Sequence, residues 1–315
     1  MHDEAELFHR YPGNPILTAH DFPYPMNSVF NPGAAMHDGE TVLLARVEDR
    51  RGISHLTVAR SADGRTDWRV EPKPLLSDDP TDPTICWGVE DARVTHVPQL
   101  DAYAITYTAY GPAGPCVALA LTKDFRTVEP YGVLMPPEDK NACLLPRTIN
   151  GQYVLFHRPV AQHGARADVW LSRSADLKSW TASEPVVQSR SGPWWDATRI
   201  GMGPTPIETP HGWLAVYHGV KKMVATDIYR VGLMLLDLDD PTRVLRRSTS
   251  WVLGPDAPYE RTGDVPNVVF PTGLVHDEDA DELRLYYGAA DSAIAVAVAS
   301  YSEVLEYVMG MPEQS

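Results

Sequence analysis

The sequence predicts an all-β protein and, within that class, a five-bladed β-propeller. Short apolar or alternating runs bounded by Gly, Pro, Asp and Asn dominate its 315 residues, whereas helical periodicity is scarce. The 28 prolines also suit many turns better than long helices. The order of the motifs repeats five times at a period of about 60 residues, which is typical of propellers. A β-sandwich also has closely spaced turns, but it does not explain a fivefold repeat.

Each repeat follows the same order of elements. It opens with a short run that contains Pro or Asp-Ala, at 31–36, 90–95, 144–149, 203–208 and 270–275. After a turn comes an aromatic-rich strand, at 41–48, 102–110, 152–159, 212–220 and 282–291. The third strand often ends in a Ser/Asp turn, at 55–64, 117–125, 168–177, 230–240 and 294–304. Three repeats continue into a further polar strand, at 67–72, 127–134 and 179–185.

The blades of a propeller close into one ring, so we expect a single domain that spans residues 1–315. Residues 1–26 precede the first repeat. We expect this N-terminal extension to wrap the outside of the ring or to help close it.

Charge and composition exclude several classes of partner. The net charge of −15 and the pI near 5.1 give a surface that repels DNA and RNA. No apolar run is long enough to span a membrane, and the first residues show no signal peptide. Three cysteines without C-x-x-C spacing indicate reduced, buried thiols and no metal site. We expect a cytoplasmic protein without a cofactor, and we leave open whether it forms a homo-oligomer.

Polar residues occupy equivalent positions of the repeats, in strands that are otherwise apolar. The innermost strand of each blade lines the central channel, so these side chains should converge there. Any one of them alone is more simply a turn residue or a surface ion pair, which is our expectation for Lys221 and Lys222. Their recurrence in five repeats favours a site instead. They are Asn31, Arg46, Glu90, Asp91, Arg93, Lys140, Asn141, His157, Arg158, Arg199, His218, Asn267 and Asp291.

The stretch C-W-G-V-E-D-A-R-V-T at residues 86–95 places two carboxylates side by side. Neighbouring residues of a strand point to opposite faces, so Glu90 and Asp91 should not form one acidic patch. We expect Asp91 to face the channel and Glu90 to pair with Arg93 or with a turn amide.

Seven motifs resemble those of one known family, glycoside hydrolase family 130, the β-mannoside phosphorylases. They are FNPGAA, GVEDAR, LFHRP, IGMGPTPIE, WLAVYHGV, VVFPTG and YYGAAD, and they follow in order from about residue 10 to residue 305. The resemblance implies a five-bladed propeller that cleaves a β-mannosidic bond with inorganic phosphate. The products are α-mannose 1-phosphate, formed with inversion, and the shortened sugar. Phosphate is then a co-substrate, and a β-mannoside is the other partner.

The resemblance also implies roles for individual residues. The general acid of the G-x-E-D motif falls on Asp91, and its proton is expected to pass through a sugar hydroxyl. The phosphate-binding residues fall on Lys140, Arg158, Arg199 and His218. Contacts to the mannosyl unit fall on Asn31, Arg46 and Asp291. Lys140 and Arg199 stand where other members carry Arg and Lys, respectively. We expect further substrate contacts from Glu90, Arg93, Tyr107, Asn141 and His157.

The residue types suit a phosphorylase. An inverting hydrolase needs an acid and a base, whereas phosphate is already an anion and needs cations around it. Asp91 must carry a proton at neutral pH to act as an acid, so we expect burial to raise its pKa. Trp87, Tyr107 and Tyr110 are candidates for stacking on sugar rings, whereas we expect Trp195 to lie in the core.

Two rival functions remain open. One is a hydrolase on the same propeller, which would need a set of acids on different blades, and the sequence offers only Asp91 and Asp291 clearly in such positions. The other is a non-catalytic sugar-binding propeller. The linkage, the acceptor sugar and the chain length depend on loops such as 73–86, 110–116, 159–167 and 187–198.

Overall fold

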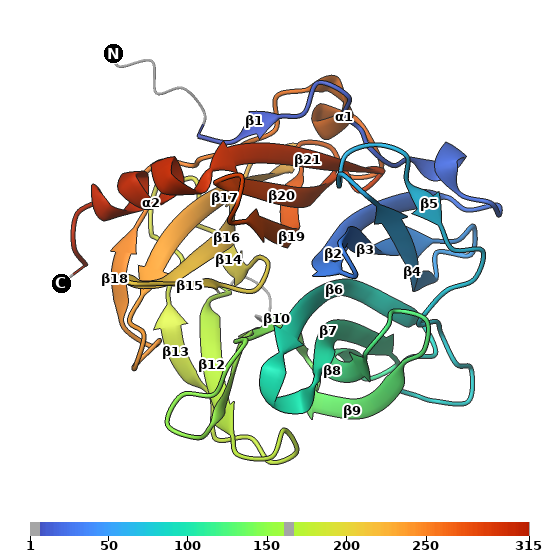
Figure 1. The fold of residues 1–315 in the computed structure, drawn as a ribbon, viewed down its shortest axis with the longest axis horizontal. Helices are drawn as coiled ribbons and strands as arrows, with labels where there is room; N and C mark the ends of the chain where they lie inside the picture. The colour runs from blue at the N-terminus through green and yellow to red at the C-terminus, as the bar shows by residue number, and fades with distance from the viewer. Residues whose placement is uncertain (1–6, 161–166, 315) are drawn as a thin grey trace.

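The all-β prediction is confirmed. The computed structural model describes residues 7–160 and 167–314, and within them it has twenty-one β-strands, two short α-helices and two 3-10 turns (Figure 1). The 3-10 turns are η1 (Ala19–Asp21) and η2 (Pro98–Leu100), and the α-helices are α1 (Pro258–Arg261) and α2 (Tyr301–Met309). Within the same ranges, neither helix is long and apolar enough to cross a membrane.

The strands form five consecutive groups, and the first strand of each lies nearest the middle of the molecule (Figure 1). The first group is β2 (Ser28–His37), β3 (Glu40–Glu48), β4 (Ser54–Ser61) and β5 (Arg69–Val70). The second is β6 (Gly88–Val97), β7 (Ala102–Gly111), β8 (Gly114–Thr122) and β9 (Glu129–Met135). The third is β10 (Asp139–Leu144), β11 (Tyr153–Pro159), β12 (Val169–Ser174) and β13 (Glu184–Val187).

The fourth and fifth groups contain the strands from β14 to β21 and, at one edge, β1. The fourth is β14 (Arg199–Met202), β15 (Ile207–Thr209), β16 (Gly212–Lys222), β17 (Asp227–Leu236) and β18 (Val244–Arg247). The fifth is β19 (Val269–Asp277), β20 (Glu282–Ala289) and β21 (Ala293–Ser300), to which β1 (His9–Arg10) is added at the outer edge. A single parallel bridge between Ser54 and Gly88 joins the first two groups into one hydrogen-bonded sheet, and each of the other groups is a sheet of its own.

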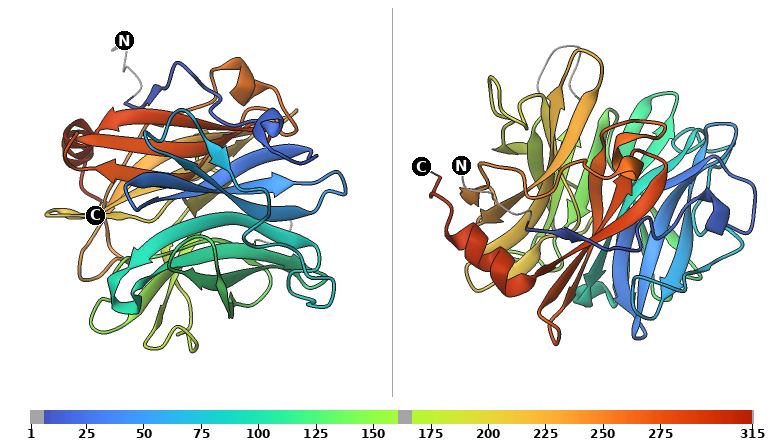
Figure 2. Two further views of the ribbon diagram at one scale, coloured as in Figure 1. Left: turned by 45° about the vertical axis from the view of Figure 1, so that its right-hand side comes forward. Right: turned by 90° about the horizontal axis from the view of Figure 1, so that it is seen from above.

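Apolar side chains fill the spaces between neighbouring groups. Five buried clusters lie between the first and second, second and third, third and fourth, fourth and fifth, and fifth and first groups. In the last of these, Leu43 and Ala45 of β3 pack with Tyr286 of β20 and Val296 of β21. Figure 2 shows from two further sides how the sheets lie face to face. Residues far apart in the sequence therefore share one core.

Tight turns in the sequence determine the hairpins that build each group. Asp38-Gly39 between β2 and β3 has φ of 51° and 78°, and Asn150-Gly151 before β11 has φ of 51° and 76°. Two-residue hairpin turns of this kind need positive φ at both positions, which Asn, Asp and Gly adopt most easily. The D-G and N-G dipeptides thus place the strands on either side in register.

Three inner strands carry the same irregularity near their first residues. Each has one extra residue relative to its partner, and this β-bulge contains a residue with positive φ: Asn31 at 45°, Asp91 at 50° and Asn141 at 55°. Asn and Asp enter the left-handed region more easily than other non-glycine residues. A bulge re-aims the side chain it carries, so the regular alternation of faces fails here.

The inner strands of the third and fourth repeats lie earlier than the sequence predicts. The structure places them at β10 and β14, not at 144–149 and 203–208, and β15 forms separately. Pro146, Pro204 and Pro206 have no N–H to donate, so the strand ladders stop before them. The sequence also missed β18 as the outer strand of the fourth group.

The N-terminal segment is tied to the fifth group. His9 of β1 pairs with Val298 of β21, and Leu17 forms a bridge with Ile294. The side chain of Asn14 adds two hydrogen bonds to the backbone of Val296, at 2.8 and 2.9 Å. Part of the predicted N-terminal extension, residues 1–6, lies outside the described residues.

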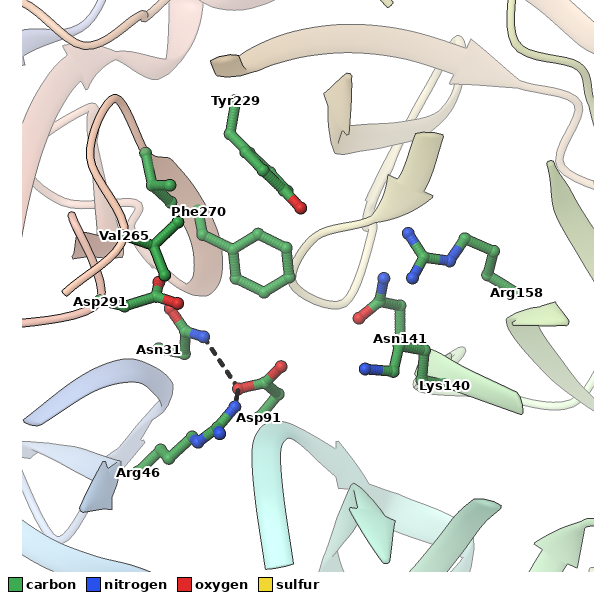
Figure 3. Close-up of a pocket in the computed structure, with 11 residues that line it drawn as sticks. Asn31, Arg46, Asp91, Lys140, Asn141, Arg158, Tyr229, Val265, Phe270 and Asp291 are labelled. Carbon is green, nitrogen blue, oxygen red and sulfur yellow. Dashed lines mark hydrogen bonds and ion pairs between the residues drawn. The ribbon is translucent and has the colours of Figure 1, made fainter. Parts of the chain in front are cut away.

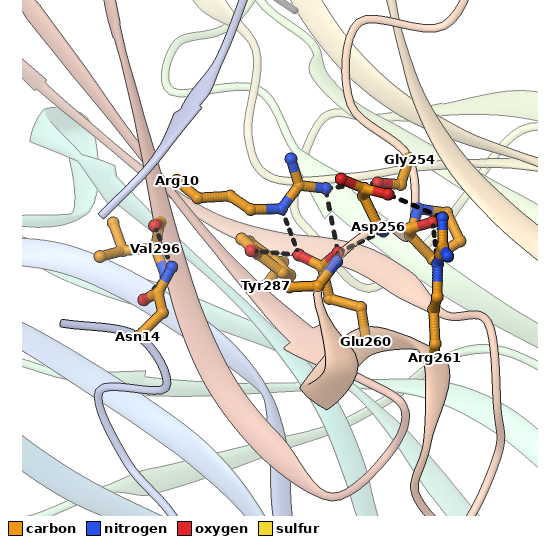
Figure 4. A network of polar contacts seen from close by, with 10 residues as sticks. Arg10, Asn14, Gly254, Asp256, Glu260, Arg261, Tyr287 and Val296 are labelled. Carbon is orange, nitrogen blue, oxygen red and sulfur yellow. Dashed lines mark hydrogen bonds and ion pairs between the residues drawn. The ribbon is translucent and has the colours of Figure 1, made fainter. Parts of the chain in front are cut away.

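A buried carboxylate, Glu260 in α1, organises this edge (Figure 4). Its oxygens accept hydrogen bonds from Arg10 Nε and Nη2 at 2.8 and 2.9 Å and from the Tyr287 hydroxyl at 2.7 Å. The backbone N–H groups of Asp256 and Ala257 also donate, at 2.7 and 3.0 Å. A fully buried charge is tolerated only with this kind of complete pairing.

Replacing Glu260 with alanine should destabilise the protein strongly. The change removes one partner of a buried ion pair, which typically costs about 3–5 kcal/mol. The control is Glu208→Ala, which removes a surface ion pair with Arg147 and should cost less than about 1 kcal/mol. Urea unfolding of both variants measures the difference, and equal losses would contradict the structural role of Glu260.

Candidate active site

A cavity of about 220 Å³ opens where the inner strands begin, in the middle of the five groups (Figure 3). Its walls come from all five groups and from the loop segment before β19. The lining residues are Asn31, Arg46, Asp91, Lys140, Asn141, Arg158, Tyr229, Val265, Val268, Phe270 and Asp291. Seven of them were predicted from the sequence as site residues, so the repeated polar positions do converge in space.

Asp91 lies on one side of the cavity and is 8% exposed. Its Oδ1 atom accepts hydrogen bonds from Asn31 Nδ2 at 2.8 Å and from Arg46 Nη1 at 3.0 Å. The other guanidinium nitrogen of Arg46, Nη2, donates to Glu90 Oε1 at 3.1 Å, and Nε donates to Ser54 Oγ at 2.9 Å. One arginine from the first group therefore holds both carboxylates of the second.

The prediction that Glu90 and Asp91 serve opposite faces is wrong. The β-bulge between Glu90 and Arg93 breaks the alternation of the strand and brings both carboxylates to Arg46. Arg93 does not pair with Glu90. It is fully buried and donates to the carbonyl oxygens of Gly203 and Asp91, both at 2.7 Å. Its guanidinium thus holds the second and fourth groups together.

The expected raised pKa of Asp91 is also wrong for this arrangement. Burial alone would raise the pKa, but Arg46, Arg93, Asn31 and Lys140 together stabilise the carboxylate and lower it below its ordinary value. The second carboxylate of the cavity behaves in the opposite way. Burial and the charge of Asp91 raise the pKa of Asp291 to about 7, against a smaller opposing effect of Arg46.

Lys140 and Arg158 lie on the opposite side of the cavity (Figure 3). They are register partners on β10 and β11, and Arg158 is 8% exposed. Among the described residues, neither side chain has a hydrogen bond or ion pair, and Arg158 Nε is buried without a partner. Burial lowers the pKa of Lys140, and burial together with Arg199 lowers the pKa of Arg158 to about 10. Two neighbouring cations, one buried and one partly buried, without an acceptor favour binding of an anion.

Arg199 and His218 do not line the cavity but lie behind two residues that do. Arg199 Nη2 donates to Asp227 Oδ2 at 2.5 Å and to the Tyr229 hydroxyl at 2.7 Å. The His218 ring is 4.5 Å from the ring of Phe270, centroid to centroid. His218 is fully buried, and burial and the charge of Arg158 lower its pKa well below the ordinary value. The contact of His218 with phosphate stays a prediction.

Three other predicted residues, Tyr107, His157 and Asn267, are not among those that line the cavity. Tyr107 packs in the core between the first and second groups, and burial raises its pKa to about 12. His157 is 1% exposed, with Nδ1 at 2.6 Å from Asp139 Oδ2 and Nε2 at 3.2 Å from Ser172 Oγ. Both of its ring nitrogens have protein partners, which suits a structural residue.

Sequence reasoning missed the four lining residues Tyr229, Val265, Val268 and Phe270. For Phe270 a signal was present, because it stands directly before Pro271 as Asn31 stands before Pro32 in the first repeat. Tyr229 lies on β17, a third-position strand that we did not expect to reach the channel. Its N–H donates to the carbonyl of Asn267 at 3.1 Å, which holds the segment before β19 against the cavity.

Glycines make room for two of the lining amides. A Cβ atom on Gly288 would lie 1.9 Å from Asn31 Oδ1, and one on Gly201 would lie 2.8 Å from Asn141 Nδ2. Both distances are far below van der Waals contact, so any side chain there would displace the amide. The glycines of Y-Y-G-A-A-D and I-G-M-G therefore have a packing reason.

In the part of the chain that the structure describes, no cluster of three or more His, Cys, Asp or Glu residues is suited to hold a metal ion.

Cys116 and Cys143 are buried as predicted. Cys86 is partly exposed, so the prediction of three buried thiols is wrong for that residue.

Comparison with known proteins gives a consistent result. The model of glycoside hydrolase family 130, described as β-1,4-mannooligosaccharide phosphorylase, matches residues 9–309. A curated β-1,4-mannooligosaccharide phosphorylase from Ruminococcus albus is 34% identical, and the match covers 97% of this chain and 92% of the relative.

Solved structures agree with this match. The β-1,2-mannobiose phosphorylase from Listeria innocua, in complex with β-1,2-mannobiose, superposes with a TM-score of 0.87 at 30% identity, covering 96% of this chain and 99% of that one. Another structure, at TM-score 0.82 and 26% identity over 95% of each chain, belongs to work stating that this family of mannoside phosphorylases contains hydrolases that target β-1,2 mannosidic linkages in Candida mannan. With a family model that spans almost the whole chain, this protein belongs to glycoside hydrolase family 130.

Proposed function

We propose that this protein catalyses the reversible phosphorolysis of a β-mannoside, giving α-mannose 1-phosphate and the shortened sugar. The observation that carries the proposal is the charge distribution across the cavity, where Asp91 faces two cations, the partly buried Lys140 and the buried Arg158. A phosphate dianion between these cations would supply the acceptor that no described residue provides. Membership of a family with named mannoside phosphorylases supports the same reaction.

In this proposal Asp91 is the general acid. Phosphate attacks the anomeric carbon from the side of Lys140 and Arg158, and the proton of Asp91 reaches the leaving sugar on the other side. Asp91 must first gain that proton. A bound dianion offsets the positive charge of Lys140 and adds negative charge nearby, both of which raise the pKa of Asp91. Phosphate binding thus prepares the acid for catalysis.

The remaining polar residues of the cavity have supporting roles in this proposal. Arg46 and Asn31 position Asp91 through its Oδ1 atom, and Asp291 holds the mannosyl unit with a carboxyl group that is half protonated near pH 7. Arg199 and His218 act from behind the wall. Arg199 fixes the Tyr229 hydroxyl, and the His218 ring supports Phe270.

We also propose that the five strand groups are the blades of one propeller, a single domain of residues 1–315. Support comes from the five buried clusters, one of which joins the last group to the first, and from β1, which completes the outer edge of the fifth group. The cytoplasmic location and the oligomeric state stay predictions.

The second candidate function is hydrolysis at the same site. The statement that this family contains hydrolases and the presence of Asp291 and Asp91 in one cavity both favour it. An inverting hydrolase needs a base to activate water, however, and would gain nothing from two cations without ion-pair partners facing its acid. The phosphate requirement separates the two reactions directly.

Product formation should depend on phosphate. Incubation of β-1,4- and β-1,2-mannobiose with the enzyme should yield α-mannose 1-phosphate only when phosphate is present. Arg158→Ala should raise the phosphate KM by about ten- to a hundredfold, because losing one charge-assisted contact costs roughly 1.5–3 kcal/mol. Arg147→Ala removes an arginine from the surface and serves as the control. Free mannose released at the same rate without phosphate would identify a hydrolase.

Asp91→Asn should lower the rate of phosphorolysis by about a hundredfold or more, because the amide keeps the shape but cannot transfer a proton. Glu90→Gln is the matched control on the same arginine, and we expect it to lower the rate by less than about tenfold. Both variants should keep the circular dichroism spectrum of the wild type. Equal losses in two folded variants would argue against a special role for Asp91.

Asp291→Asn should make the protein more stable at neutral and alkaline pH while reducing its activity. The folded pKa of Asp291 is about 7 and the ordinary value is 3.8, so the unfolded chain releases this proton first as pH rises. Folding stability therefore falls between about pH 4 and pH 7, and the penalty is full above pH 7. Asparagine has no such penalty.

We expect this variant to gain on the order of 2 kcal/mol at pH 8 and nothing near pH 4, measured by urea unfolding across that range. Asp281→Asn is the control of opposite sign, because hydrogen bonds from Ser300 and Ser302 lower the pKa of Asp281. A gain for Asp291→Asn that is the same at every pH would show that the carboxyl group is not protonated in the folded state.

A further inference from the structure

A groove of about 470 Å³ lies on the other face of β17 from the active-site cavity. Ile228 and Arg230 line the groove, whereas Tyr229 between them lines the cavity. Neighbouring side chains of a strand point to opposite faces, so β17 separates the two hollows. The groove has a volume typical of small-molecule sites, which range from about 300 to 1,000 Å³. Three tryptophans and a lysine also line it: Trp194, Trp195, Trp251 and Lys221.

The tryptophans give the groove a buried base and exposed walls. Trp195 is buried, as predicted, and belongs to the core between the third and fourth groups. A Cβ atom on Gly219 would lie 2.5 Å from Trp195 Cζ3, and one on Gly232 would lie 2.6 Å from Cη2. Both glycines therefore let this indole lie directly on the sheet. Trp194 and Trp251, in contrast, are 40% and 44% exposed, so their rings are available to a ligand.

Arg230 is a cation of the groove that has no acceptor. Its guanidinium carbon lies 4.2 Å from the ring centroid of Trp251. Its Nε atom is buried without a partner, and within the described residues the side chain has no hydrogen bond or ion pair. Burial lowers its pKa. Arg158 of the active-site cavity has the same unpartnered Nε. A cation that is desolvated without an acceptor favours binding of an anion.

Lys221 supplies a second positive charge to the groove. It lies opposite Ile228 in the β16–β17 ladder, which places it diagonally from Arg230 on the same face of the sheet. Its Nζ atom donates to the carbonyl oxygen of Pro193 at 3.0 Å, directly before Trp194 in the chain. The described lining residues include no carboxylate. In a chain with a net charge of −15, the groove is thus a local positive region.

We propose that this groove is a second binding site for a sugar phosphate, with the phosphate on Arg230 and Lys221 and the sugar ring against Trp194. Guanidinium groups bind phosphate oxygens in a forked arrangement, and the C–H faces of pyranose rings pack on aromatic rings. A neutral sugar would leave Arg230 without an acceptor, and inorganic phosphate would leave the indole uncovered. The choice of α-mannose 1-phosphate as the ligand rests on the function proposed above, because that reaction releases it.

The test counts binding sites by calorimetric titration with α-mannose 1-phosphate in the absence of an acceptor sugar. The wild type should bind two molecules per chain, one in the cavity and one in the groove. Arg230→Ala should weaken one site by about ten- to a hundredfold, because it removes a charge-assisted contact. Arg158→Ala should weaken the other site, and the double variant should lose both. Arg243→Ala is the control, because Arg243 pairs with Asp237 and does not line the groove.

Trp194→Ala tests the contact to the sugar. In the Arg158→Ala background, where the titration reports the groove, it should weaken binding of α-mannose 1-phosphate by about two- to tenfold. Binding of inorganic phosphate should not change, because Arg230 packs on Trp251 and not on Trp194. Trp194→Phe keeps an aromatic face and should recover much of the affinity.

Two results would overturn the proposal directly. One is a single site in the wild type, and the other is two unchanged sites in an Arg230→Ala protein with the wild-type circular dichroism spectrum. Equal affinity for inorganic phosphate and α-mannose 1-phosphate, unaffected by Trp194→Ala, would show a general anion site instead. A Trp194→Ala protein that changes its oligomeric state, with no ligand bound in the groove of the wild type, would show a protein interface.

The proposed function has a separate test. If the wild type forms no α-mannose 1-phosphate from any β-mannoside and phosphate, that function fails, whereas the number of binding sites is still measured by titration. The two failures are therefore distinct.

Discussion

The β-bulge at the start of three inner strands is the constraint on which the rest of the site depends. Asn31, Asp91 and Asn141 each adopt positive φ there, and each side chain reaches the cavity. In a regular inner strand, successive side chains would alternate between the two neighbouring cores. The bulge adds a residue that belongs to neither face, and this allows a polar side chain to leave an otherwise apolar strand. Residues that tolerate the left-handed conformation are required at these positions.

The charges of the cavity are separated by the order of the groups around it. Arg46 of the first group forms ion pairs with Glu90 and Asp91 of the second, whereas Lys140 and Arg158 of the third have no ion pair within the described residues. An electrically uneven cavity of this kind costs folding energy, because burial lowers the pKa of both cations. Such a cost is expected where a ligand completes the charge balance, and it gives the site an intrinsic preference for an anion beside an acid.

Aromatic side chains and the residues behind them shape the wall between these charges. Burial and the surrounding cations lower the pKa of His218 well below its ordinary value, and the His218 ring packs against Phe270. Arg199 stacks over Tyr229 and binds its hydroxyl, which fixes the aromatic wall. The cavity therefore combines two aromatic residues with a ring of amides and charges, a composition that suits a sugar phosphate reaction.

By itself the sequence determined the fold class, the fivefold repeat and the positions at which polar residues recur. Periodicity and turn residues such as Asp38-Gly39 and Asn150-Gly151 are local signals, and local signals can be read along the chain. From the recurring positions we predicted a shared channel, and seven of the predicted residues line one cavity: Asn31, Arg46, Asp91, Lys140, Asn141, Arg158 and Asp291. Only the tertiary structure decided that the pKa of Asp91 falls while that of Asp291 rises, and that Glu90 shares Arg46 with Asp91. It also decided that Tyr229 and Phe270 line the cavity wall in place of Arg199 and His218. These properties depend on bulges that break the strand alternation and on charges contributed by groups far apart in the sequence, and neither is visible in local pattern.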